Sequence, residues 1–144
     1  MMLFVEARAR RVCDFVVREP VVRDGVSFVK PDLLLVRGDT LFVVDVAVAS
    51  DAFMRETADA KREKYDTPRL NVVFVELVKS AGFDVKNVVH SPFVVGARGL
   101  LDSSAADTMR LLSFSSRDVD DVVLLVVRGS LSTYPQYYRS TFCS

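Results

Sequence analysis

The sequence predicts one α/β domain over residues 1–144, a mixed sheet of four to five strands flanked by helices. Half of the 144 residues are hydrophobic, and a chain of this length can bury a sizeable core. Two valine-rich runs, apolar on both faces, flank Gly38 and Asp39, which is typical of strands inside a covered sheet. Segments whose apolar residues recur at helical spacing precede and follow these runs.

The N-terminal segment is predicted to form a helix followed by an extended stretch. Apolar residues recur at helical spacing at Val5, Ala9, Val12 and Val16. This spacing predicts a helix over about residues 2–13. Residues 14–22 are expected to be extended, with Pro20 at a sheet edge or bulge. The cluster of Arg8, Arg10 and Arg11 fits either a solvated helix face or a phosphate-binding one.

A β-hairpin is predicted next, with Gly38 and Asp39 as its two-residue turn. Pairing Arg37 with Thr40 and stepping outward brings Asp32 opposite Asp45 on one face, with Cβ atoms about 5 Å apart. Two like charges facing each other on an apolar hairpin need a proton, an opposite charge or a cation.

A divalent cation with oxygen ligands resolves this conflict. Mg²⁺ suits Asp32 and Asp45, Mn²⁺ can substitute for it, and a main-chain carbonyl near Val46 is a candidate third ligand. The structural alternative is that Asp32 merely begins a strand after Pro31 and that Asp45 pairs with an arginine.

An amphipathic helix is predicted over about residues 52–65, capped by Ser50 or Asp51. Two lysines fall on its apolar side, with Lys61 close to the centre and Lys64 near the helix end, where it can extend to solvent. The carboxylate pair is the natural partner of Lys61. A lysine held near a metal and a phosphate can position water or neutralise developing charge.

The remaining chain is predicted to add two strands and two helices. Strands are expected over residues 70–78 and 87–96, the second containing the single histidine, His90, for which a structural or surface role is favoured. Capping-box patterns predict helices over about 105–112 and 116–131, so that the C-terminal part, about 102–144, is helical. Residues 122–127 could instead form a buried strand.

The order of several short motifs resembles the restriction-like endonuclease domain of site-specific non-LTR retrotransposons, a branch of the PD-(D/E)XK superfamily. The resemblance spans about residues 8–113. The motifs are Glu19-Pro20, Gly25, Lys30-Pro31-Asp32-Leu33, Val44-Asp45-Val46, Lys61-Arg62-Glu63-Lys64-Tyr65 and Gly96-Ala97-Arg98-Gly99.

The resemblance implies a PD-(D/E)XK core whose metal-dependent nuclease activity nicks DNA, leaving a 3′-hydroxyl that a reverse transcriptase of the same parent polypeptide extends in the nucleus. By this pattern Asp32 and Asp45 bind the metal, and Lys61 or Lys64 is the catalytic lysine. Tyr65 closes the lysine motif, and Glu19 helps to hold the site. The chain departs from the simple (D/E)-X-K spacing, which would place a lysine where Ala47 stands.

Two further basic residues are predicted to contact DNA, Lys30 beside the first acid and Arg98 in a glycine-flanked turn. A formal net charge of zero counts against strong DNA binding by this chain alone. Arginines outnumber lysines 14 to 5, which partly offsets this, because arginine suits phosphate recognition.

Composition bears on the compartment of the protein and on whether it spans a membrane or binds zinc. No apolar run approaches the roughly 20 residues of a membrane span. Cys13 and Cys143 show no CxxC spacing, which favours a reducing intracellular compartment and no zinc site. Two rival functions remain open: an inactive nuclease-fold module that binds DNA or protein, and a Holliday-junction-resolvase-like enzyme, which would require a dimer.

Overall fold

The computed structural model describes residues 1–23, 25–26 and 28–142, with side chains described up to residue 129. Four strands form the main sheet in the order β1-β4-β5-β6. They are β1 (Phe15–Arg18), β4 (Leu33–Arg37), β5 (Thr40–Ala49) and β6 (Asn87–Gly96). The first three are antiparallel, and β6 runs parallel to β5. The sheet is therefore mixed, as the sequence predicts. A separate two-stranded sheet pairs β2 (Val22–Arg23) with β3 (Phe28–Val29).

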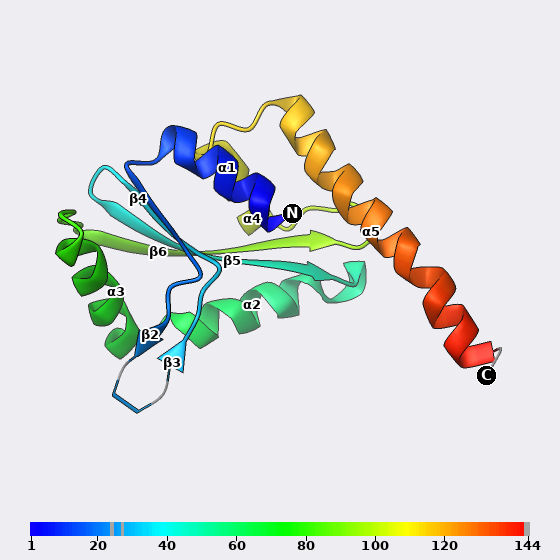
Figure 1. The fold of residues 1–144 in the computed structure, drawn as a ribbon, viewed down its shortest axis with the longest axis horizontal. Coiled ribbons are helices and arrows are strands. Elements are labelled where there is room, and N and C mark those ends of the chain that lie inside the picture. The colour runs from blue at the N-terminus through cyan, green and yellow to red at the C-terminus, as the bar shows by residue number, and fades with distance from the viewer. Residues whose placement is uncertain (24, 27, 143–144) are drawn as a thin grey trace.

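Helices cover both faces of the main sheet, as Figure 1 shows. One face packs against α1 (Met2–Val12), α4 (Ser103–Leu111) and α5 (Ser116–Phe142). The other packs against α2 (Met54–Tyr65), which follows a short 3₁₀ turn, η1 (Asp51–Phe53), and against α3 (Pro68–Ser80). The described residues contain no helix long and apolar enough to cross a bilayer. Cys13 is half-buried, and Cys143 lies outside the described residues.

The central hairpin has the predicted register. Arg37 pairs with Thr40 and Leu33 pairs with Val44, so the turn is Gly38-Asp39. Gly38 has φ of 62°, a conformation that glycine adopts without strain, and its N–H donates to Asp14 Oδ2 at 2.8 Å. Side chains alternate between the faces, so Asp45 lies on the face that α2 and α3 cover, together with Val43.

Residues 70–78 form a helix, and the prediction of a strand there is wrong. Thr67 caps α3 by accepting a hydrogen bond from the N–H of Leu70, and Pro68 occupies the first turn, where its missing N–H costs nothing. The buried residues Leu70, Phe74 and Val78 recur every four positions and line one helix face. The helical spacing and the cap outweigh the preference of the many valines for strands.

The C-terminal half follows the prediction, with shifted boundaries. The cap of α4 is Asp102, whose carboxylate accepts from the N–H of Ser104, so the helix begins before the predicted capping box. Ser115 and Asp118 cap α5 reciprocally, as that pattern predicts. Residues 122–127 are helical rather than a strand, and α5 continues to Phe142, beyond the expected end. Ser50 provides no side-chain cap for the turn before α2.

Candidate functional site

Two carboxylates lie close together where the start of β4 runs beside the middle of β5. Asp32 directly precedes β4. Asp45 lies in the middle of β5, and only 4% of this residue is exposed. The N–H of Asp32 donates to Asp45 Oδ1 at 3.3 Å, and the N–H of Val46 donates to Asp32 Oδ2 at 2.7 Å. The predicted hairpin register therefore does bring the two acids together.

The surroundings of Asp32 shift its ionisation. Burial, and after it the neighbouring Asp45, raise the pKa of Asp32 from 3.8 to about 6, against the lowering effects of the Val46 N–H and of Lys61. Part of the excess negative charge is thus relieved by a proton at Asp32 when no cation is present.

Asp32→Asn is expected to flatten part of the pH dependence of stability in the presence of a chelator. Because the folded-state pKa of about 6 exceeds the unfolded value of 3.8, the folded protein binds more protons between these limits. Stability from this group is therefore greatest below the lower pKa and is lost as the pH rises through about 6. Urea unfolding of the wild type and Asp32→Asn across this range measures the difference. A stability difference between the two proteins that stays constant with pH would contradict the shift.

Lys61 is the lysine that reaches the carboxylates. Its Nζ lies 2.7 Å from Asp45 Oδ2, and its side chain remains 32% exposed. Lys64, one turn further along α2, is exposed and lies over the ring of Tyr65, 5.1 Å from the centroid. The two lysines that the sequence leaves as alternatives are thus separated: Lys61 neutralises the buried acid, and Lys64 points to solvent.

Tyr65 closes the site at the C-terminal end of α2. It is buried, and its hydroxyl donates to the carbonyl of Lys30 at 3.5 Å. Burial raises the pKa of Tyr65, and the charges of Asp45 and Asp32 raise it further. The hydroxyl therefore stays protonated at neutral pH, so Tyr65 can donate hydrogen bonds but does not serve as a base.

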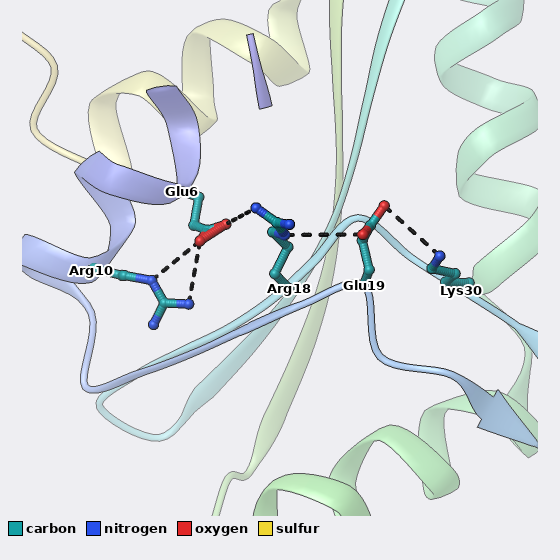
Figure 2. A network of polar contacts seen from close by, with 5 residues as sticks. All are labelled: Glu6, Arg10, Arg18, Glu19 and Lys30. Atoms are coloured by element: carbon teal, nitrogen blue, oxygen red, sulfur yellow. Dashed lines mark hydrogen bonds and ion pairs between the residues drawn. The ribbon is translucent and has the colours of Figure 1, made fainter. Parts of the chain in front are cut away.

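Glu19 contacts the site through its backbone, while its side chain takes part in a separate network. Its N–H donates to the carbonyl of Asp32 at 2.8 Å, and its φ is 51°. The carboxylate forms ion pairs with Lys30 at 3.9 Å and Arg18 at 4.0 Å. Figure 2 shows this chain of alternating charges, which continues through Glu6 to Arg10. The side chain thus links Arg18 to Lys30, close in sequence to Asp32.

Two other predicted residues lie at different distances from the acids. Val46 donates its N–H to Asp32, and the role of its carbonyl as a metal ligand stays a prediction. Arg98 is exposed in the turn after β6, where its backbone N–H donates to Asp51 Oδ1 at 3.3 Å. Asp45 pairs with Pro92 of β6. Gly96, the last residue of β6 before this turn, lies four residues further on, roughly 13 Å from Pro92 along the strand. Arg98 therefore does not join the carboxylate cluster.

Two of the three arginines clustered on α1 form contacts within the protein. Arg8 donates to the carbonyl of Ser113 at 2.7 Å and lies 3.7 Å from Asp118. Arg10 pairs with Glu6 at 3.4 Å. These contacts, and the exposure of Arg10 and Arg11, fit the interpretation of a solvated helix face.

His90 has partners that the sequence does not reveal. Its Nε2 lies 2.7 Å from Asn71 Oδ1 and 3.5 Å from Asp66, and burial lowers its pKa. Asn71 lies in α3, the segment predicted as a strand, so its position could not be anticipated. The four-residue spacing of Leu70 and Phe74 is the signal that would have found the helix. His90 also lines a small gap with Asp45, Lys61 and Tyr65.

The donor set fits Mg²⁺. Among the described residues no three His, Cys, Asp or Glu side chains gather into a complete ligand cage. Mg²⁺ commonly needs no such cage, because it retains several waters and binds through one or two carboxylates and the phosphates of a substrate. Asp32 and Asp45 supply two such carboxylates, and burial together with the nearby Asp45 raises the pKa of Asp32, which a bound cation would oppose.

No protein-family model and no curated protein matches this chain. Among solved structures it is similar to the small subunit of a heterodimeric restriction endonuclease. The sequence identity is 10%, the alignment covers 87% of this chain and 79% of that chain, and the TM-score is 0.29.

Proposed function

We propose that this chain is a metal-dependent DNA endonuclease of the PD-(D/E)XK type that nicks its target and leaves a 3′-hydroxyl. The observation that carries the proposal is the convergence of Asp32, Asp45 and Lys61 on one covered face of the sheet. A stable fold gains little from a buried carboxylate beside a half-buried one, whereas phosphodiester hydrolysis uses such a pair.

Each residue has a role that follows from its position. Asp32 and Asp45 would hold Mg²⁺ or Mn²⁺, which when bound polarises the phosphodiester and lowers the pKa of a water. The N–H of Val46 fixes the orientation of the Asp32 carboxylate. Lys61 pairs with Asp45, and a metal bound to Asp45 would weaken this ion pair. Its ammonium would then orient the attacking water and stabilise the charge on the phosphate oxygens. Tyr65 keeps Lys30 and the entrance of the site in place.

The biological setting of the proposal comes from the resemblance. A reverse transcriptase in the same parent polypeptide would extend the 3′-hydroxyl on chromosomal DNA in the nucleus. Lys30 and Arg98 would contact DNA outside the carboxylate site, Lys30 at its entrance and Arg98 beyond the end of β6.

The test of the proposal is nicking of supercoiled plasmid by the purified chain. Conversion to open circles is expected with Mg²⁺ or Mn²⁺ and not with a chelator, and the nicks should be sealed by a ligase that requires a 3′-hydroxyl and a 5′-phosphate. A folded protein that neither nicks DNA with either metal nor binds metal in calorimetry would refute the proposal.

Lys61→Met is expected to slow nicking about 100-fold, because removing one group that stabilises transition-state charge commonly has an effect of this size. Lys64→Met is the matched control on the same helix, and we expect its rate to stay within about threefold of wild type, since an exposed lysine contributes through weak surface electrostatics. Single-turnover nicking rates measure both. Equal losses in the two variants, or a larger loss at Lys64, would reverse the assignment.

A second candidate function is an inactive nuclease-fold module that binds DNA or a protein. The ion pair of Lys61 with Asp45 favours it, because the ammonium already supplies the charge that a metal would bring. Metal titration separates the two, since the module binds no Mg²⁺ at this pair. A resolvase-like enzyme would instead be a dimer and cut branched DNA faster than linear duplex.

A further inference from the structure

The β2–β3 hairpin stands apart from the main sheet. Figure 1 shows it projecting beside the C-terminal end of α2 and the first turn of α3. Val22 is buried in the apolar cluster that includes Leu70 and Phe74, so β2 is anchored to α3. The described residues of the hairpin thus project on the side of the sheet that carries Asp45, with β2 held against α3.

The outer side of this hairpin presents an aromatic ring and a cation. Val22 pairs with Val29 on the inner side, and Arg23 pairs with Phe28 on the outer side. Phe28 is 66% exposed and Val26 is 79% exposed. A single exposed leucine is common on protein surfaces. An exposed aromatic ring next to an exposed valine and a cross-strand arginine instead indicates a binding surface.

The hairpin is attached to the carboxylate site at both ends. The N–H of Glu19 donates to the carbonyl of Asp32, and the hydroxyl of Tyr65 donates to the carbonyl of Lys30. Glu19 precedes β2 and Lys30 follows β3, and the ion pair between them joins the two ends of the hairpin, as Figure 2 shows. Phe28 lies four residues before Asp32, hence within about 14 Å along the backbone, even if fully extended. Successive nucleotides of one strand are about 3.4 Å apart, so this reach corresponds to about four nucleotides.

The charges around the hairpin favour a nucleic-acid strand as its occupant. Arg23 and Lys30 are exposed cations on the hairpin and on the segment that leads from it to Asp32, and Lys30 is also paired with Glu19. A cation beside an exposed aromatic ring is a combination that binds strands with unstacked bases, because every base has a face on which to stack. Continuity with the carboxylate site indicates that the strand is the one being cut.

We propose that the β2–β3 hairpin binds the DNA strand next to the scissile phosphate, with Phe28 stacked on an unpaired base and Arg23 on a neighbouring phosphate. The inference rests on the proposed function, since it names the substrate class of that same site. It assigns to the enzyme a preference for DNA with unpaired bases near the nick, such as a gap or a branch, over intact duplex.

The test is binding of fluorescently labelled gapped and intact duplexes in chelator, so that cleavage plays no part. Phe28→Ala is expected to weaken binding to gapped DNA about tenfold, which corresponds to 1.4 kcal/mol and lies within the range for stacking of one base. Phe28→Trp should restore the affinity. Phe53→Ala is the matched control, because Phe53 is 61% exposed and lies in η1, outside the hairpin. Arg23→Ala should reduce the dependence of binding on salt by about one phosphate contact.

The outcomes separate the inference from the proposed function. Equal binding of wild type and Phe28→Ala to gapped DNA overturns the inference, even if plasmid is nicked. Binding that depends on Phe28 in a protein that never nicks supports the hairpin as a DNA contact and refutes the nuclease. If Phe28→Ala changes only self-association in sedimentation, the hairpin is an interface between copies of the chain and the inference is wrong.

Discussion

Asp45→Asn is expected to lower metal-dependent nicking at least about a thousandfold. The charge stabilisation that a metal provides in phosphoryl transfer is worth several kcal/mol, and each 1.36 kcal/mol corresponds to a factor of ten in rate. Asp45 is the more buried of the two acids and contacts both the backbone of Asp32 and Lys61, so its loss removes the centre of the site. Single-turnover nicking with Mg²⁺ measures the change.

The asparagine variant is chosen because it keeps the shape of the side chain and an oxygen that can accept from the N–H of Asp32. Lys61 loses its partner but is 32% exposed, so it can turn to solvent and the fold should persist. Asp39→Asn, at the exposed turn of the same hairpin, is the control and should nick at the wild-type rate. A folded Asp45→Asn protein that retains wild-type nicking would place the active site elsewhere.

The proximity of Asp32 and Asp45 could be predicted because the geometry that brings them together is local. A two-residue turn fixes the register of both its strands, so the identity of Gly38 and Asp39 suffices to bring Asp32 opposite Asp45. The position of Lys61 on the apolar side of α2 follows from the helical repeat alone. The choice between Lys61 and Lys64 could not be made, because it depends on how α2 is placed over the sheet.

The parts that escaped prediction depend on contacts distant in sequence. The four-residue spacing of Leu70 and Phe74 is a local sign of the helix, but the many β-branched side chains of residues 70–78 favour a strand. Packing against Val22 of β2 and Val36 of β4 decides for the helix. The contact of His90 with Asn71 could not be predicted either, because it depends on residues 70–78 being a helix rather than a strand. The exposure of Phe28 also required the structure, because a short strand with an apolar residue is normally assigned to a core.

Phe74→Ala is expected to destabilise the fold by about 3–5 kcal/mol, the range for truncating a fully buried phenylalanine. Phe74 has no exposed surface and packs in the cluster that joins α3 to β4 and β5, with His90 near its ring. A domain is commonly stable by only about 5–15 kcal/mol, so this loss brings the variant close to unfolding. Urea unfolding followed by circular dichroism measures the free energy and the slope with denaturant.

Val72→Ala on the same helix is the matched control for Phe74→Ala. Val72 is 58% exposed, so its truncation should change stability by less than about 0.5 kcal/mol. The pair also tests the helix itself: positions 72 and 74 share a face in a strand but point in different directions in a helix. Similar losses at both positions would contradict the helical arrangement of α3 over the carboxylate face, and a loss confined to Phe74 would support it.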